Sequence, residues 1–191
     1  MATPCISCVE YLCRYHCSQW HTLFVVPMKE FDYSLDYKNT LFEPNDPRYR
    51  IGRGEQGVLL IRPYTDDICK YWRFKTVPEA RVSSQRIYDL YTEYRSEGDF
   101  VGMDMCRKFL EMGFTRARRY ANHTDGKKYD AEGNVKPQEP DALTSEKAIS
   151  ARIFKQMRDE VAYDPVYKHM RKEWREFENS HPPKTEQSVL T

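Results

Sequence analysis

A short segment near the start of the chain alternates between hydrophobic and polar residues. Every second position there is hydrophobic, namely Phe31, Tyr33, Leu35 and Tyr37. Because side chains of a strand point alternately to its two faces, this period of two predicts a half-buried strand. A continuous apolar run over residues 57–62 predicts a second strand, and residues 72–74 predict a third. The three segments together predict one small sheet.

The remaining chain repeats its apolar positions with the spacing of helices. A capping box at Thr76 and Glu79 predicts the start of a helix that ends at Gly98. Towards the C-terminus, residues 149–161 and 165–177 each carry apolar side chains three or four positions apart. This spacing predicts two further amphipathic helices.

The middle of the chain predicts two more helices and a long loop. One helix is expected from about residue 99 to residue 112, with Gly113 as its stop signal. A short helix over residues 115–120 follows. Residues 123–143 contain turn-forming dipeptides without a sustained apolar period, which predicts a surface loop.

The predicted fold class is therefore α+β, with about three short strands followed by about five helices. The domain prediction is a Cys-rich N-terminal extension over residues 1–27, a single globular domain over 28–178 and a disordered tail over 179–191. A chain of 191 residues is long enough to bury one substantial core.

The composition predicts a soluble protein and does not identify its partners. No stretch approaches the roughly 20 apolar residues that cross a bilayer. The apolar run over residues 23–28 is too short for a signal-peptide core. We therefore expect a cytoplasmic protein, with a nuclear location as the alternative. The formal net charge is +1, so any attraction to polyanions must come from the local distribution of charge.

The N-terminal cysteines raise the question of a metal site. A cytoplasmic location argues against a disulfide framework. We expect no metal site, and the alternative is a zinc site whose ligands would be Cys5, Cys8, Cys13 and Cys17.

Residues 52–57 read G-R-G-E-Q-G, a spacing that brings backbone amides close to phosphate. A dinucleotide-binding fingerprint would need a strand before the glycines and a helix after them, and the sequence predicts neither there. Lys75 follows the loop as in a kinase, but no kinase catalytic loop follows. A glycine turn and an anion-binding nest remain open. The candidate ligand contacts are Gly52, Arg53, Gly54, Gly57 and Lys75.

Residues 107–128 contain seven basic side chains and two acidic ones. Arg116 and Arg119 share one helix face, with Tyr120 and His123 close by. Guanidinium groups beside an aromatic ring suit phosphate contacts and base stacking. The alternative is that these arginines pair with carboxylates of neighbouring helices.

The candidate acid–base residues for an enzyme are Glu55, Asp104 and His123. They have no diagnostic spacing, and no hydrolase, metalloprotease or Walker motif is present. Whether the chain is an enzyme, and which cofactor it would use, the sequence leaves undetermined.

Four strings of the sequence resemble a widespread family that carries only a domain-of-unknown-function label. They cover residues 49–59, 72–76, 99–105 and 112–123, and read YRIGRGEQGVL, WRFKT, DFVGMDM and MGFTRARRYANH. The similarity extends over about residues 28–177. It implies no activity, but its strings include the glycine loop, Lys75 and the basic helix.

The functional expectation is a module that binds DNA, RNA or another phosphate-bearing ligand. The geometric hypothesis is that Arg53, Lys75, Arg116, Arg119 and His123 converge on one positive cleft. The alternative is a small-molecule enzyme of nucleotide or biosynthetic metabolism. The sequence leaves the oligomeric state undetermined.

Overall fold

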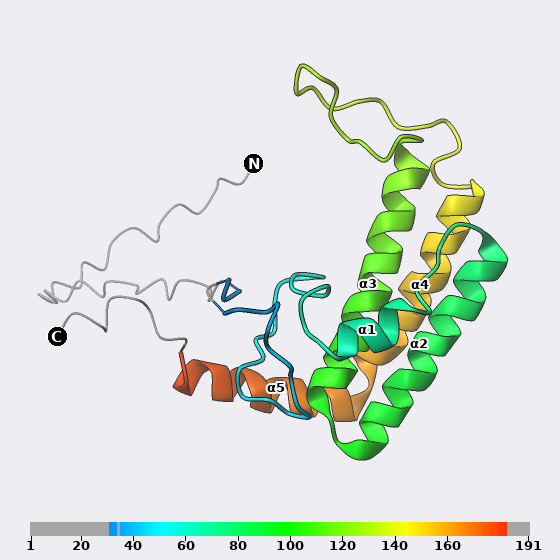
Figure 1. The fold of residues 1–191 in the computed structure, drawn as a ribbon. Coiled ribbons are helices and arrows are strands. Elements are labelled where there is room, and N and C mark those ends of the chain that lie inside the picture. Colours follow the sequence, from blue (N-terminus) through cyan, green and yellow to red (C-terminus); the bar gives the residue numbers. More distant parts are fainter. Residues whose placement is uncertain (1–30, 34, 183–191) are drawn as a thin grey trace, which may run out of the picture.

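The computed structural model describes residues 31–33 and 35–182, and this part of the chain is helical (Figure 1). Its helices are α1 (Tyr64–Cys69), α2 (Val77–Glu97), α3 (Phe100–Asn122), α4 (Glu146–Tyr163) and α5 (Pro165–Ser180). The described residues contain only two isolated β-bridges, Leu41 with Arg62 and Tyr129 with Val135. The predicted α+β fold class is therefore wrong, because the three expected strands form no sheet.

The apolar run over residues 57–62 forms consecutive tight turns instead of a strand. The Val58 amide donates to the Glu55 carbonyl at 3.1 Å, and the Leu60 amide donates to the Gly57 carbonyl at 2.9 Å. Gly57 adopts a φ of 80°, which favours glycine. These turns bury Val58 and Ile61, which are three residues apart. A continuous run of apolar residues is thus compatible with turns that bury every third residue as well as with a buried strand.

In the alternating segment, residues 31–33 and 35–38 form an irregular coil that aromatic stacking holds together. Phe31 stacks on Tyr37 with ring centroids 5.4 Å apart, and Tyr37 stacks on Phe42 at 6.1 Å. The Tyr37 amide donates to the Leu35 carbonyl, which closes a turn inside the expected strand. The rings find partners within the coil itself, so no neighbouring strand is needed to bury them.

The capping residues of α2 behave as the sequence predicts. The Thr76 side chain accepts from the Glu79 amide, and the Glu79 carboxylate accepts from the Thr76 amide at 2.9 Å. Gly98 ends the helix with a left-handed φ of 69°. The predicted bounds of this helix are confirmed.

α3 is one continuous helix, so the predicted stop at Gly113 and the separate helix over 115–120 are wrong. A Cβ atom at Gly113 would lie 2.4 Å from the Phe154 ring of α4. The glycine therefore serves close helix packing within α3 and does not end it. The two helices predicted nearest the C-terminus are confirmed as α4 and α5, whereas α1 was not predicted.

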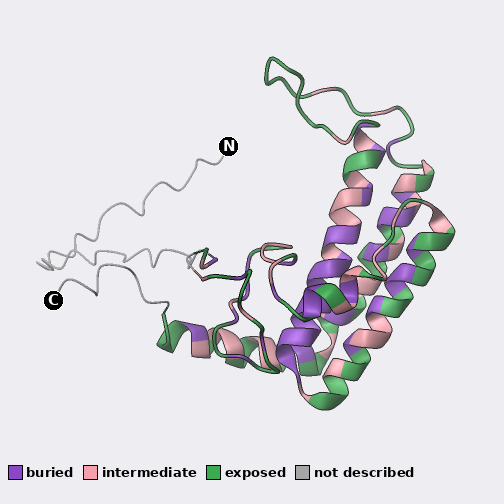
Figure 2. Cartoon of the chain, in the orientation of Figure 1, coloured by how far each residue is buried: buried purple, intermediate pink, exposed green. Residues whose placement is uncertain are grey.

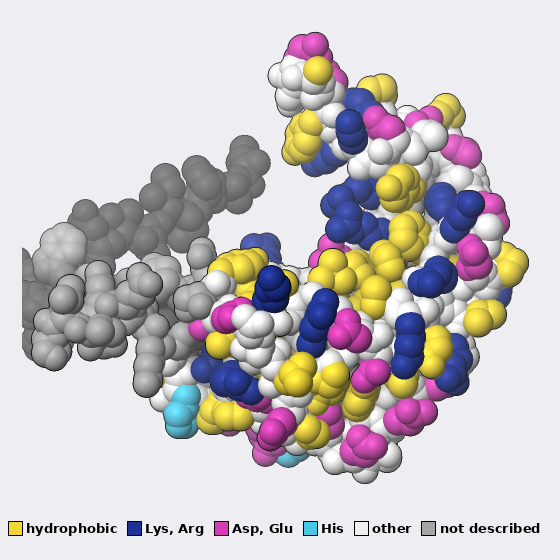
Figure 3. Space-filling view, viewed as in Figure 1, with side chains coloured by type: hydrophobic (Ala, Val, Ile, Leu, Met, Phe, Trp, Pro, Cys, Tyr) yellow, Lys and Arg dark blue, Asp and Glu magenta, His cyan; other side chains and the backbone are white. Residues whose placement is uncertain are grey.

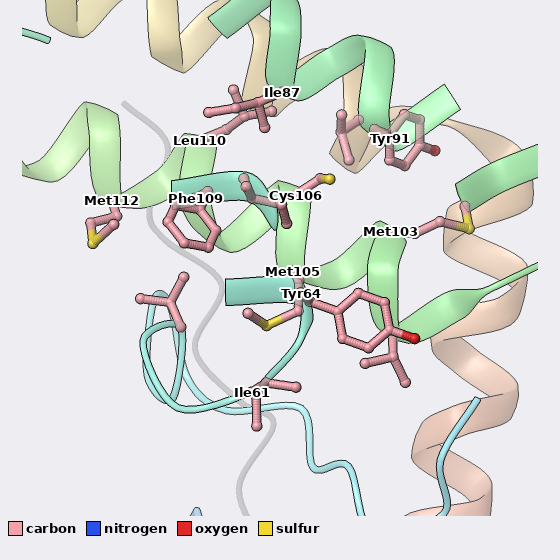
Figure 4. Packing of buried hydrophobic residues seen from close by; sticks show 14 of the residues in the cluster. Ile61, Tyr64, Ile87, Tyr91, Met103, Met105, Cys106, Phe109, Leu110 and Met112 are labelled. Carbon is pink, nitrogen blue, oxygen red and sulfur yellow. The ribbon is translucent and has the colours of Figure 1, made fainter. Parts of the chain in front are cut away.

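The core lies where α3 packs between α2 and α4, and every residue of α3 from Phe100 to Leu110 is buried (Figure 2). α1 covers this stretch, so that Ile61 and Tyr64 approach Met105 and Phe109 (Figure 4). The coil of residues 35–63 contacts both α3 and α5, because the Tyr49 hydroxyl donates to Asp104 and the Ile51 amide donates to Glu178 Oε1 at 2.6 Å. None of α1 to α5 has the length and apolar character of a membrane-spanning segment, as far as the described residues go.

The connection between α3 and α4 contains no helix, as predicted. Residues 124–141, which we call the arm, project beyond the end of α3 (Figure 1). The antiparallel bridge between Tyr129 and Val135 closes its tip. The Asp130 carboxylate accepts from the amides of Glu132 and Asn134, which supports the turn at the tip.

Candidate functional site

A buried charged centre around Asp104 joins α3 to α5 and to the coil. Asp104 is 0% exposed and accepts hydrogen bonds from the hydroxyls of Tyr49 in the coil and Tyr167 in α5. Arg107 Nε donates to the same carboxylate at 2.9 Å, and Arg171 Nη1 donates at 3.0 Å. One carboxylate therefore organises side chains from three separate segments.

Opposing effects set the ionisation of this centre. Burial alone would raise the pKa of Asp104, but the charges of Arg107, Lys108 and Arg171 hold that pKa far below its usual value. The Asp104 carboxylate and burial raise the pKa of Tyr49 well above its usual range. Asp104 is thus ionised and enclosed at neutral pH, an arrangement that suits a structural role better than proton transfer.

Lys108 is the least satisfied member of the Asp104 centre. Its side chain is fully buried, and Nζ lies 3.7 Å from Asp104 Oδ2 and 4.9 Å from the centre of the Tyr49 ring. No hydrogen-bond acceptor lies within reach of Nζ in the described part of the chain. Burial lowers the pKa of Lys108 to about 8, although the Asp104 carboxylate opposes this shift.

The glycine loop lies directly against α3. The Gly54 carbonyl accepts from Arg107 Nη2 at 3.3 Å, and the Glu55 carboxylate accepts from the Thr115 hydroxyl at 2.6 Å. Gly57 is required on steric grounds as well, because a Cβ there would lie 2.4 Å from the Phe31 ring. A Cβ at Gly52 would lie 2.6 Å from the Gln56 carbonyl oxygen. The loop therefore meets the helix through a carbonyl and a carboxylate.

Arg116 and Arg119 lie on α3 beyond the part that the glycine loop covers. Arg119 is one helical turn after Thr115, and Arg116 is one turn before Tyr120. Neither guanidinium has an ion pair or a side-chain hydrogen bond among the described residues. Figure 3 shows Lys and Arg side chains gathered over α3 on a hollowed face, with hydrophobic side chains between them.

Other arginines near this face already have partners inside the protein. Arg118 donates to the Ala142 carbonyl at 2.8 Å and to Asn122 Oδ1 at 2.6 Å. Arg158 of α4 forms an ion pair with Glu111 at 2.6 Å. Arg118 and Arg158 thus have hydrogen-bond or ion-pair partners, whereas Arg116 and Arg119 have none among the described residues.

An aromatic pair lies beside the two free arginines. The rings of Tyr120 and Phe74 have centroids 6.1 Å apart, and Tyr120 is 41% exposed. Next to Phe74, the Lys75 carbonyl accepts from Lys147 Nζ at 2.5 Å, and this ammonium lies 5.4 Å from the centre of the Phe74 ring. Burial lowers the pKa of Lys147 from its usual value. Cationic side chains therefore flank the aromatic pair on both sides.

His123 caps the C-terminal end of α3, where the arm begins. It is buried, and its Nδ1 has no hydrogen-bond partner among the described residues. Its backbone amide donates to the Arg119 carbonyl at 3.0 Å. The imidazole is thus enclosed one turn beyond Arg119.

The predicted site residues fall into two groups on α3. Gly54 and Glu55 contact its middle, whereas Arg116, Arg119, Tyr120 and His123 occupy its C-terminal end, with Lys75 beside them through Phe74. Arg53 lies on the exposed side of the loop. The four N-terminal cysteines lie outside the described residues. Among the described residues, no group of three side chains could hold a metal ion.

Sequence reasoning missed the Asp104 centre as a unit. A signal was present, because Arg107 and Lys108 follow Asp104 by three and four positions inside an otherwise apolar stretch. The partners Tyr49, Tyr167 and Arg171 are more than 50 residues away in the sequence and gave no local signal.

The fold and these contacts define a helical domain whose central helix carries a buried charged centre near one end and, near the other, the half-buried Arg116 and the exposed Arg119. The chain belongs to the family DUF4385, a domain of unknown function, and the match covers residues 32–177. No match was found among curated proteins or among solved structures.

Proposed function

We propose that this protein is a nucleic-acid-binding module that contacts phosphates through Arg116 and Arg119. The observation that supports this most directly is that both guanidinium groups, on the C-terminal half of α3, have no carboxylate partner among the described residues, and Figure 3 shows Lys and Arg side chains gathered over α3 beside a hollow. Arginine presents five donors in a planar fork, which matches the oxygens of a phosphate group.

Local charge carries the proposal, because the formal net charge of the chain is only +1. Surface arginines that serve stability are usually engaged with carboxylates or carbonyls, as Arg118 and Arg158 are here. Two adjacent guanidinium groups that repel each other contribute nothing to stability by themselves. An anionic ligand would offset this repulsion.

The open shape of the face favours a polymer over an enclosed metabolite. In Figure 3 the hollow lies between α3, the arm and the coil, and these described parts do not close over it in that view. Small ligands are usually buried over most of their surface in a pocket, whereas nucleic acids lie along open grooves. The enzyme alternative would require an enclosed site near Glu55 or His123.

The test is a fluorescence-anisotropy titration of the full chain with labelled DNA and RNA oligonucleotides at several salt concentrations. Two phosphate contacts predict a slope of log K against log salt of about −1.4 to −1.8. The double variant R116A/R119A should bind far more weakly and lose this slope. The matched control is R81A/K172A, which removes two exposed cations from α2 and α5.

Circular dichroism and thermal unfolding verify that both double variants fold. If wild type shows no salt-dependent binding to any oligonucleotide, the proposal is wrong. It is equally wrong if the control variant loses as much affinity as R116A/R119A. A phosphorylated metabolite that stabilises wild type, but not a Glu55→Gln variant, would favour the enzyme instead.

A further inference from the structure

We infer that the nucleic acid bound on this face is single-stranded. The inference rests on the proposed function and adds the class of substrate. It depends on two features of the described residues, namely an exposed Tyr120 ring that packs on the half-buried Phe74 within the basic strip, and acidic groups on both sides of that strip.

The basic strip consists of Arg116, Arg119, Tyr120, Phe74 and Lys75. Arg116 and Arg119 adjoin Tyr120 on α3, and Phe74 packs against Tyr120 with its ring tilted by 31°. Lys75 follows Phe74 in the chain and is exposed. The aromatic pair therefore has Arg116 and Arg119 near it along α3 on the Tyr120 side and Lys75 next in the chain on the Phe74 side.

This order matches the chemistry of a single strand. Proteins that bind single strands combine a positive groove for the backbone with aromatic side chains that stack on the bases. The bases of a duplex are stacked on each other, so the exposed part of the Tyr120 ring would find no free base face there. An unpaired base can reach this ring while its flanking phosphates contact Arg116 and Lys75.

Acidic groups limit the strip at its lower edge. The Glu55 carboxylate lies against Thr115, which is one helical turn before Arg119. The Thr115 hydroxyl is the only described side-chain partner of the Glu55 carboxylate. Among the described residues, no cation forms an ion pair with this carboxylate. A second phosphate backbone on this side of Arg119 would face a carboxylate.

The arm adjoins the end of the strip, because it begins just after the C-terminal end of α3 and projects beyond it (Figure 1). Its acidic residues are Asp125, Asp130, Glu132, Glu139 and Asp141, and its basic residues are Lys127, Lys128 and Lys136. Lys136 is already engaged, because its Nζ forms an ion pair with Asp125 at 2.6 Å. The arm therefore has an excess of negative charge and would repel the second strand of a duplex.

The experiment compares labelled single strands of about ten nucleotides with the matching duplex and with a free mononucleotide, because single-strand sites commonly span about 4–16 nucleotides. Single-stranded DNA or RNA should bind about tenfold or more tightly than the duplex. Y120A should weaken single-strand binding about fivefold or more, because stacking contributes strongly per base. Y120F should retain binding.

Two further variants separate stacking from folding. Y120L keeps apolar bulk against Phe74 but cannot stack on a base, so it should fold like wild type and bind like Y120A. Y163A removes a more exposed tyrosine, 69% accessible on α4, and should bind like wild type. Thermal unfolding of each variant confirms that the comparison concerns folded protein.

The outcomes distinguish this inference from the proposed function. Duplex binding as tight as single-strand binding would overturn the inference and leave the proposed function in place. The same holds if Y120L binds like wild type, or if the mononucleotide binds as tightly as the strand. Absence of binding to every nucleic acid would overturn the proposed function itself.

Discussion

Asp104 and Lys108 carry opposite charges in the same buried centre, yet their removal should have opposite consequences. Asp104 compensates three cations, so D104N leaves Arg107, Lys108 and Arg171 without their carboxylate. Breaking a buried ion pair in this way costs about 3–5 kcal/mol. We expect D104N to lower the free energy of unfolding by that amount in urea titrations monitored by circular dichroism.

The variant Lys108→Met is the informative comparison for D104N. The methionine side chain fills a similar volume and removes an ammonium that has no hydrogen bond among the described residues. Asp104 keeps Arg107 and Arg171, so the free energy of unfolding should stay unchanged or rise by about 1 kcal/mol or more. A loss as large as that of D104N would show that Lys108 supports the centre.

The lowered pKa of Lys108 also predicts how stability depends on pH. Burial lowers this pKa to about 8 in the folded protein, whereas an unfolded lysine titrates near 10.4. Between these values the unfolded chain binds more protons, so stability should rise as pH increases from about 8 to about 10. Above this window, Tyr49 and Tyr167 act in the other direction, because burial and Asp104 raise their pKa values and stability falls as unfolded tyrosines ionise.

The measurement is the urea unfolding midpoint of wild type and K108M at pH 7, 8, 9 and 10. The difference between the two proteins isolates Lys108, because the tyrosines are common to both. As pH rises from about 8 to about 10, the unfolding midpoint of wild type should rise relative to that of K108M. A constant difference would mean that Lys108 titrates in the folded protein as it does in the unfolded chain.

At the scale of elements, close packing between α3 and α4 depends on the missing side chain of Gly113. Alanine favours helix by about 1 kcal/mol over glycine, so G113A would stabilise an exposed helix. Here the added Cβ would lie 2.4 Å from the Phe154 ring, and overpacking of this kind costs about 1–3 kcal/mol. We expect G113A to lower the thermal unfolding midpoint.

A double-mutant cycle with F154A verifies the cause. When the ring is absent, the new methyl group has room, and G113A should cost less or become favourable. If G113A lowers stability equally in wild type and in F154A, the Phe154 ring is not the steric obstacle to alanine at position 113.

Local signals predicted the helices better than any other element. Thr76 and Glu79 form the capping box that the sequence indicated, because a cap depends only on residues within one turn. The prediction at Gly113 was wrong because a glycine can end a helix or can allow two helices to pack closely. Only the position of the Phe154 ring distinguishes these two roles. The expected strands failed for a similar reason, since Phe31 and Tyr37 bury their rings against each other inside a coil.

The candidate site shows the same division between local and distant information. Arg116, Arg119, Tyr120 and His123 lie within eight residues of one helix, so their proximity followed from helical periodicity alone. The contact of Phe74 with Tyr120 spans 46 positions in the sequence and needed the tertiary structure. Whether Arg116 and Arg119 were neutralised by distant carboxylates was equally inaccessible to the sequence.

For the whole molecule, the proposed preference for single strands depends on the distribution of charge around the hollow. The net charge of +1 hides local differences, because α3 carries two arginines without a carboxylate partner among the described residues, whereas the arm carries five acidic and three basic side chains. Because the arm joins α3 to α4 without packing into the core, its charges can be changed without disturbing the helices. The arm therefore offers a direct test of charge selection.

The variant E132Q/D141N removes two negative charges from the arm. The side chains of Glu132 and Asp141 are exposed and form no hydrogen bond or ion pair within the described residues, so the fold should be unaffected. With less repulsion of a second backbone, duplex affinity should rise, while single-strand affinity should change little. The ratio of the two affinities, measured by anisotropy at low salt, should fall and return towards the wild-type value at high salt. The control E93Q/E97Q removes equal charge from exposed positions of α2 and should leave the ratio unchanged, because these residues lie on a helix outside the hollow. An equal rise in duplex affinity for both double variants would show that total charge, and not the acidic arm, governs the choice of strand.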